Sequence, residues 1–350
     1  MVGGMVAACL PAARPRNGGV PRRILVIRPG GIGDAVLLMP ALLALKKRYP
    51  QASLTVLAER RNGGAFALCP AVDRLLLYDT PAHLFSAIRG GYDLVIDTEQ
   101  WHRLSAVVAR LGSAGNSIGF ATNDRSRLFS HQVGYSHDDY EADSFFSLLA
   151  PLAIAKPARL SLPFVTIPQQ ALERADQELA VPSGNRFVAI FPGASTPERR
   201  WGAERFRVVA ERLGQKGIPA VVVGGKDDAA EGEVIVQGCG GVNLAGRTSL
   251  AETAAVLARS ALLISGDSGV LHIAVGLVIP TVSLFGPGIE AKWGPKGEGH
   301  VVLNRRLSCS PCTRFGTTPP CPSGARCLAE ITPEEVVRAA KELLAKSDRL

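Results

Sequence analysis

Short apolar segments alternate with helical patterns along most of this chain of 350 residues, a pattern that is typical of parallel α/β sheets. A chain of this length exceeds one ordinary hydrophobic core, so two domains are expected. The first half contains predicted strands at residues 23–28, 53–58, 74–78, 92–97 and 117–120. The second half contains predicted strands at residues 187–191, 220–223, 261–264 and 278–284.

Prolines mark the junction between the two series of strands. They interrupt a stretch that holds one amphipathic helix, predicted at about 169–179. The expected organisation is a disordered tail (1–22), a first Rossmann-like domain (23–160), a linker (161–185), a second Rossmann-like domain (186–330) and a C-terminal helix (331–350). Thr332 is the predicted N-cap of the last helix. Pro40 is expected to kink a helix that runs from about 34 to 48.

The composition is that of a soluble globular protein, with 47% hydrophobic and 20% charged residues. No apolar stretch reaches the ~18 residues that a membrane helix needs. In residues 1–22 the arginines follow the apolar part, the reverse of a secretory signal, so a cytoplasmic location is expected. The net charge of +8 suits an anionic partner such as a phosphorylated lipid surface, and no motif indicates nucleic acid.

The turn after the strand at 261–264 has the features of a diphosphate site. It contains Asp267, Ser268 and Gly269, and a helix is predicted from about Ser268. The first N–H groups of a helix have no partner within it, and the helix dipole favours negative charge there. The next strand ends at Gly286, which is expected beside this turn.

This stretch resembles the nucleotide-sugar-binding motif of glycosyltransferase family 9, the ADP-heptose:lipopolysaccharide heptosyltransferases. The family pattern D-[ST]-G-x-x-H, followed by P-T-x-x-x-F-G-P, fits Asp267 to His272 and Pro280 to Pro287. The resemblance extends over about 23–344 and implies a GT-B fold, with two Rossmann-like domains facing each other across a cleft. The first domain is then the acceptor side, and the second binds the nucleotide sugar.

The implied reaction is inverting transfer of a sugar, most simply heptose from ADP-heptose, onto the inner core of lipopolysaccharide. It needs no cofactor and takes place at the cytoplasmic face of the inner membrane, in peripheral contact with it. Metal-dependent transferases carry a D-x-D motif. Asp227 and Asp228 are adjacent and so do not form this motif. A metal-independent mechanism is therefore expected.

The turn after the first strand carries Gly31, Gly33 and Asp34, without the full G-x-G-x-x-G spacing of a dinucleotide site. Taken alone, Asp34 is expected to cap the following helix. In glycosyltransferase family 9 the corresponding aspartate is taken as the general base. The resemblance therefore implies that Asp34 deprotonates the acceptor hydroxyl.

The turn after residues 187–191 resembles the family segment Pro-Gly-Ala that leads to Lys-x-Trp, with Arg199 at the lysine position. The family lysine contacts the donor phosphates, and arginine keeps that charge in a planar fork of donors. Ser195 and Thr196 would add hydroxyl donors, whereas Arg200 is expected to be solvated. Asp228, or equally its neighbour Asp227, is assigned to the donor ribose by the same resemblance.

Three further groups are open to two interpretations. His272 is either a packed helical histidine or a residue on the phosphate side. Residues 97–103 close a strand, and two interpretations stand for them: His102 and Arg103 meet an anionic acceptor, or Glu99 and Gln100 provide ordinary helix-start polarity. Four cysteines follow the spacing C-x2-C-x8-C-x5-C, and the sequence leaves open whether they bind zinc: Cys309, Cys312, Cys321 and Cys327.

Three alternative functions remain. The first is transfer of another sugar, from a UDP- or GDP-hexose, to a different glycan. The second is a nicotinamide-dependent oxidoreductase, which the first glycine-rich turn suggests and its spacing disfavours. The third is a binding protein without catalysis, which Asp34 disfavours. The identity of the sugar and the acceptor, and the oligomeric state, do not follow from the sequence.

Overall fold

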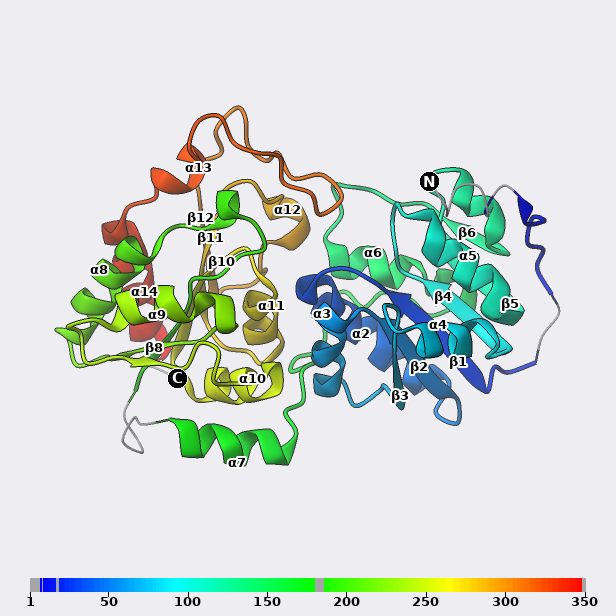
Figure 1. Cartoon of the computed structure of the whole chain (residues 1–350), viewed down its shortest axis with the longest axis horizontal. Helices are drawn as coiled ribbons and strands as arrows, with labels where there is room; N and C mark the ends of the chain where they lie inside the picture. Colours follow the sequence, from blue (N-terminus) through cyan, green and yellow to red (C-terminus); the bar gives the residue numbers. More distant parts are fainter. Residues whose placement is uncertain (1–6, 8, 17–18, 180–185, 348–350) are drawn as a thin grey trace. The chain divides into compact units, whose positions relative to one another are not determined.

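The computed structural model describes residues 7, 9–16, 19–179 and 186–347, which form two compact units that divide between Phe164 and Val165 (Figure 1). The division lies inside the segment 161–185. None of the described helices is both long and apolar enough to cross a membrane.

The first unit is built on a parallel six-stranded sheet in the order β3-β2-β1-β4-β5-β6. Its strands are β1 (Arg23–Arg28), β2 (Ser53–Ala58), β3 (Arg74–Leu77), β4 (Tyr92–Asp97), β5 (Ser113–Phe120) and β6 (His131–Val133). Its helices are α2 (Ile32–Arg48), α3 (Arg60–Gly63), η1 (Gly64–Leu68), α4 (Pro81–Ile88), α5 (Arg103–Gly112), η2 (Asp124–Leu128), α6 (Glu141–Ser147) and η3 (Ala150–Leu152). The central strands are buried over nearly their whole length, as expected for a sheet covered on both faces.

The second unit repeats this plan with a parallel sheet in the order β12-β11-β10-β7-β8-β9. Its strands are β7 (Val188–Phe191), β8 (Ala220–Val222), β9 (Val242–Asn243), β10 (Leu262–Gly266), β11 (Thr281–Phe285) and β12 (His300–Asn304). Its helices are α7 (Gln169–Glu178), η4 (Pro197–Arg199), α8 (Ala203–Gly214), η5 (Lys226–Asp228), α9 (Ala229–Val236), α10 (Leu250–Arg259), α11 (Gly269–Gly276), α12 (Glu290–Trp293), α13 (Arg326–Ala329) and α14 (Pro333–Ser347). In Figure 1, α8 and α14 lie on one side of this sheet and α11 on the other.

Counted from the first strand of each unit, both sheets have the order 3-2-1-4-5-6, which is the Rossmann order. The predicted α/β class is therefore confirmed for each unit. In such sheets ligands bind outside the carboxyl ends of the strands, where the strand order reverses. This places the candidate sites after β1 and β4 in the first unit, and after β7 and β10 in the second.

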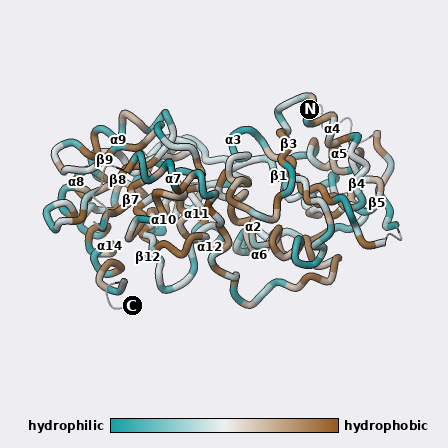
Figure 2. The backbone as a smooth tube through the Cα atoms, turned by 90° about the horizontal axis from the view of Figure 1, so that it is seen from below, coloured by the Kyte–Doolittle hydropathy of each residue, from teal (hydrophilic) through white to brown (hydrophobic). Residues whose placement is uncertain are grey.

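The core of the second unit joins the turn after β7 to the C-terminal helix. Trp201 is 2% exposed, and its indole Nε1 donates a hydrogen bond of 3.0 Å to the carbonyl of Ile331. Its ring meets Phe206 of α8 edge to face, with centroids 4.8 Å apart. Figure 2 shows hydrophobic colouring around α10 and α11, and α11 is buried along almost its entire length.

Most predicted strands occur with slightly shifted ends; β5, for example, begins at Ser113 instead of residue 117. Three short strands were not predicted: β6, β9 and β12. β6 and β9 are very short and partly polar, and β12 is only half-buried throughout. None of the three has the long apolar run that identifies a buried central strand. Helix α2 continues through Pro40, and the predicted Thr332 cap of α14 is confirmed, because Thr332 N–H donates to Glu335 Oε2 at 2.9 Å.

The predicted tail and linker differ from what the described residues show. Within the predicted disordered tail, residues 1–6, 8 and 17–18 lie outside the described part, but residues 9–16 are attached to the first unit. Ala13 N–H donates to the carbonyl of Arg127 at 2.9 Å, and Arg16 N–H donates to Asn116 Oδ1 at 2.9 Å. Within the predicted linker, α7 packs on α10, with Asp176 paired to Arg259 at 2.6 Å. Both segments are therefore held by tertiary contacts.

Candidate active site

Asp34 lies in the first turn of α2, directly after the carboxyl end of β1. Gly31 is the N-cap of this helix and Gly33 lies within it. Gly30 adopts a positive φ of 108°, and its N–H donates to Glu59 Oε2 at 3.2 Å. The side chain of Asp34 is 22% exposed, so this carboxylate is sheltered yet accessible.

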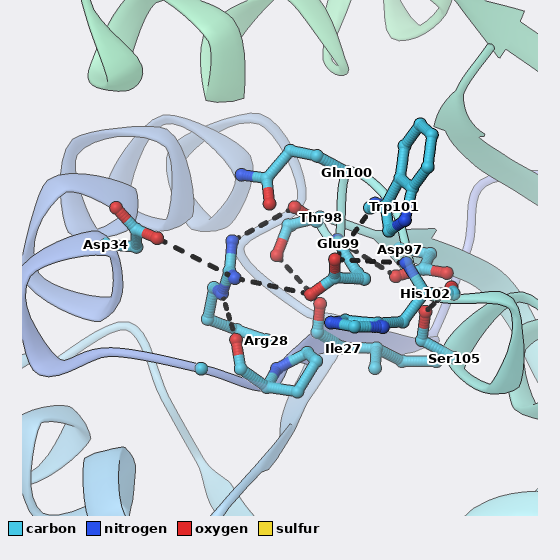
Figure 3. A network of polar contacts seen from close by, with 12 residues as sticks. Ile27, Arg28, Asp34, Asp97, Thr98, Glu99, Gln100, Trp101, His102 and Ser105 are labelled. Atoms are coloured by element: carbon cyan, nitrogen blue, oxygen red, sulfur yellow. Dashed lines mark hydrogen bonds and ion pairs between the residues drawn. The ribbon is translucent and has the colours of Figure 1, made fainter. Parts of the chain in front are cut away.

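Arg28, the last residue of β1, is at the centre of the polar network around Asp34 (Figure 3). It is 2% exposed, and its Nε donates to the carbonyl of Pro29 at 2.6 Å, while Nη1 donates to the carbonyl of Thr98 at 3.0 Å. Its Nη2 lies 3.8 Å from Asp34 Oδ2 and 3.7 Å from Glu99 Oε2. One guanidinium is therefore shared by two carboxylates.

Glu99 is held in place by its own loop. Its Oε1 accepts the N–H of Trp101 at 2.9 Å and that of His102 at 3.3 Å. Burial works to raise the pKa of Glu99, but Arg28 and these two N–H groups outweigh it and lower the pKa. Glu99 is therefore ionised. Its contact with Arg28 is an interaction that ordinary helix-start polarity does not account for.

Asp97 forms the interior support of the same loop. It pairs with Arg125, and both side chains are fully buried. Arg125 also donates to the carbonyl of Glu99 and to Ser105 Oγ, the latter at 3.1 Å. Of the residues predicted on the acceptor side, Arg103 pairs at the surface with Asp124 at 2.6 Å, and His102 is the N-cap of α5.

Two side chains near Asp34 were missed by the sequence reasoning. Tyr135 donates to Glu141 Oε2 at 3.4 Å, and Glu141 is completely buried. Burial, followed by the charges of Glu141 and Asp34, raises the pKa of Tyr135, so its hydroxyl is neutral. No local motif marks these residues, because they reach Asp34 only through the fold.

In the second unit, the turns after β7 and β10 are joined by a pair between Arg199 and Asp267. Their side chains are 15% and 8% exposed. Among the described residues, neither Arg199 Nε nor the hydroxyl of Thr196 has a hydrogen-bond partner, although both atoms are buried. Buried polar atoms are nearly always paired, so two such donors in one turn make it a candidate site for a ligand with acceptor oxygens.

Ser268 caps α11 in the same place. Its Oγ accepts the N–H of Leu271 at 3.3 Å and lies 2.8 Å from Ser265 Oγ. Gly269 begins the helix, so its first N–H groups lie at the turn that carries Asp267. His272 is 1% exposed and therefore packed inside the unit.

Asp228 connects the turns after β7 and β8. Its Oδ2 accepts the N–H of Gly225 at 2.9 Å, and its Oδ1 accepts from Arg200 Nη2 at 3.1 Å. Arg200 also pairs with Glu231 at 2.8 Å, so the prediction of a solvated arginine is wrong. These contacts position the two turns, and Asp227 is the exposed carboxylate of the adjacent pair.

Two glycines after β11 permit close packing at this site. A Cβ on Gly286 would stand 2.7 Å from Leu328 Cγ and 2.9 Å from Cys327 Sγ, so this glycine lets the cysteine segment approach. A Cβ on Gly288 would stand 2.0 Å from Asp267 Oδ2. Ser195, in contrast, is exposed. Gly288 was missed, although it directly follows the motif that ends in Pro287.

The four cysteines of the C-terminal segment are not gathered into a set of metal ligands in the described part of the chain. No group of three or more histidine, cysteine, aspartate or glutamate side chains in the described part of the chain is arranged to hold a metal ion. All four cysteines are free thiols. Burial raises the pKa values of Cys312 and Cys327, which keeps those thiols neutral. The backbone of Cys312 instead anchors the segment, donating to the carbonyl of Pro287 at 3.0 Å.

The sequence model of glycosyltransferase family 9 (heptosyltransferase) matches residues 82–321. Lipooligosaccharide heptosyltransferase 2 of Haemophilus ducreyi is 26% identical over 92% of this chain and 99% of that protein. The crystal structure of a family 9 glycosyltransferase from Veillonella parvula is similar with a TM-score of 0.78 and 23% identity, over 93% of this chain and 97% of that one. The E. coli ADP-heptose lps heptosyltransferase II has a TM-score of 0.75 and 22% identity, over 93% and 99% of the two chains. This structural likeness confirms the predicted GT-B fold.

The clash predicted at Gly288 tests the geometry of the pair between Arg199 and Asp267. We expect Gly288→Ala to displace the Asp267 carboxylate and to lower the free energy of unfolding by about 1–3 kcal/mol, measured in urea. Gly299→Ala is the matched control, because a Cβ there meets nothing within 4 Å. Equal unfolding midpoints for the two variants would contradict the described packing.

Proposed function

This chain belongs to glycosyltransferase family 9, and we propose that it transfers heptose from ADP-heptose to the inner core of lipopolysaccharide by one inverting displacement. The observation that carries the proposal is the pair of unpartnered donors, Arg199 Nε and the Thr196 hydroxyl, at the turn beside the N-terminus of α11. Both donors suit the oxygens of a diphosphate.

The diphosphate is bound by complementary positive charge. Arg199 supplies a guanidinium, and the N-terminus of α11 at Ser268 and Gly269 supplies backbone N–H groups and a favourable dipole. Asp267 holds Arg199 in position. As the bond to the sugar breaks, these groups stabilise the negative charge that develops on the departing ADP.

The other contacts to the nucleotide sugar are assigned from where each residue lies relative to Arg199 and the N-terminus of α11. Ser195 adds a hydroxyl to the phosphates, and Gly286 keeps the neighbouring loop close. His272 packs behind the phosphate turn. Asp228 orders the turn that faces the ribose.

The general base is Asp34. Its carboxylate takes the proton of the acceptor hydroxyl while that oxygen attacks the anomeric carbon. Gly31 and Gly33, on either side of Ile32, add no side chains of their own beside Asp34. The base therefore belongs to the first unit and the donor site to the second.

The acceptor is a phosphorylated glycolipid, so the enzyme works in peripheral contact with the cytoplasmic face of the inner membrane. The net charge of +8 supports contact with an anionic surface. The transfer needs no divalent metal, because Arg199 and the N-terminus of α11 supply the positive charge that metal ions provide in other transferases.

Calorimetric titration with ADP, UDP, GDP and NADH, followed by transfer assays, tests this function. We expect ADP to bind most tightly, and ADP-heptose to be consumed with a lipid A–Kdo acceptor at a rate that EDTA leaves unchanged. Preference for UDP or GDP would replace the donor, tight binding of NADH alone would overturn the transferase, and inhibition by EDTA would refute metal independence.

The base is tested by Asp34→Asn. This change removes the proton acceptor but keeps the shape of the side chain, so kcat is expected to fall by about 10²–10⁴-fold with the dissociation constant for ADP unchanged. Asp79→Asn is the control, because Asp79 is 44% exposed and its contact with the Arg60 N–H, at 3.2 Å, can be kept by the oxygen of an asparagine. Wild-type turnover by Asp34→Asn would remove Asp34 from the reaction.

The donor site is tested by Arg199→Met and Arg199→Lys. Loss of a charge-assisted contact is expected to weaken ADP binding by about ten- to a hundredfold in Arg199→Met. Arg199→Lys restores the residue that the family pattern has here and should recover most of that affinity. If calorimetry finds the same ADP affinity in Arg199→Met as in the wild type, Arg199 does not bind the diphosphate.

A further inference from the structure

We infer that Arg28 and Glu99 act together as positioning residues for Asp34: Glu99 restrains Arg28 so that the guanidinium supports the charge of Asp34 without closing on it. This inference rests on the proposed role of Asp34 as the base. It concerns residues that touch neither the donor site nor the reacting atoms, and it follows from the geometry shown in Figure 3.

Arg28 is fixed in one orientation. Because a buried guanidinium is costly unless its donors are satisfied, its contacts are decisive. Nε and Nη1 donate to two carbonyls, at 2.6 and 3.0 Å, and Cζ lies 5.6 Å from the centre of the Phe145 ring. A Cβ on Gly30 would come within 3.0 Å of Nη2, so the glycine leaves room for this placement.

The remaining nitrogen, Nη2, lies at almost the same distance from the carboxylates of Asp34 and Glu99. It lies 3.8 Å from Asp34 Oδ2 and 3.7 Å from Glu99 Oε2. A charge-assisted hydrogen bond between nitrogen and oxygen measures about 2.7–2.9 Å. Arg28 thus attracts both carboxylates from an intermediate distance, and it forms a short bond with neither.

Glu99 is the fixed member of this trio. Two N–H groups hold its other oxygen, and Arg125 holds its carbonyl. Asp34 lies at the start of α2, where its side chain is 22% exposed. The charge of Glu99 therefore fixes the position of the Arg28 guanidinium, and the guanidinium sets the electrostatic potential at Asp34.

Each removal has a distinct consequence. Without Arg28, Asp34 and Glu99 both lose the guanidinium that lies between them. Burial raises the pKa of Glu99 and Arg28 is the largest influence that lowers it, so Glu99 becomes protonated in this variant. Asp34 then lacks the guanidinium that positions its carboxylate. Without the charge of Glu99, Arg28 closes on Asp34 and occupies the oxygen that must accept the proton.

The test is a double-mutant cycle on the full chain, with kcat, KM and ADP affinity measured for every variant. We expect Arg28→Met to lower kcat by about a hundredfold and Glu99→Gln by about tenfold, with ADP affinity unchanged. In the double variant the two losses are expected not to add, because Glu99 acts on Asp34 only through Arg28. The kcat of the double variant is therefore expected to equal that of Arg28→Met within about twofold.

A merely structural role would give a different result. A double variant about tenfold slower than Arg28→Met, so that the two losses add, would show that the residues act independently and would overturn the inference. If Arg28→Met does not fold, as judged by urea unfolding, Arg28→Lys replaces it in the same cycle, because lysine keeps the charge but lacks the fork that reaches both carbonyls. Glu99→Gln is nearly isosteric and tests the inference by itself: an unchanged kcat in this variant would overturn it.

Asp34→Asn in the same series separates the two hypotheses. If Asp34→Asn is inactive and the losses of Arg28→Met and Glu99→Gln add in the double variant, only the coupling of Arg28 and Glu99 fails. If Asp34→Asn transfers at the wild-type rate, the proposed base fails and this inference fails with it. The series uses whichever nucleotide sugar the wild-type enzyme turns over, so a wrong donor does not affect the outcome.

Discussion

In each unit, a charged pair joins the turn after the first strand to the turn after the fourth. Arg28 follows β1 and lies 3.7 Å from Glu99, which follows β4. Arg199 follows β7 and pairs with Asp267, which follows β10. The strand order makes these turns neighbours, because the first and fourth strands are adjacent and end at the same edge of the sheet. Both candidate sites depend on this constraint.

The two arginines differ in what they leave unsatisfied, and this difference matches the two chemical tasks. Arg28 donates from Nε and Nη1 to carbonyls of its own unit, and its Nη2 lies between two carboxylates. It therefore arranges charge around Asp34, the proposed base. Arg199 keeps a buried Nε without a partner among the described residues, next to the hydroxyl of Thr196, which also has no partner there. It therefore suits an anion from outside the chain. The same topology thus carries the proposed proton-accepting site in one unit and the proposed anion-binding site in the other.

Much of the fold could be predicted because the central strands are continuous apolar runs. β1, β2 and β4 have the predicted bounds, and the edge strands β6, β9 and β12 were missed because they are short or only half-buried. The position of a candidate residue could be predicted where a motif is local: Asp34 lies in the first turn of α2, and Ser268 caps α11, as expected. It could not be predicted where a role depends on a distant partner. Arg200 was expected in solvent, and only the fold brings Asp228 and Glu231 to it.

The sequence by itself determined the α/β class, the two series of strands and the polar turns at which chemistry takes place. These follow from hydrophobic periodicity and from glycine-rich turns, which act over a few neighbouring residues. Tertiary structure alone decided which charges surround Asp34, because Glu99 and Tyr135 come from separate loops. It also decided that the four cysteines form no metal site within the described residues. Burial and ion pairing depend on distances across the fold, and no local pattern in the chain records those distances.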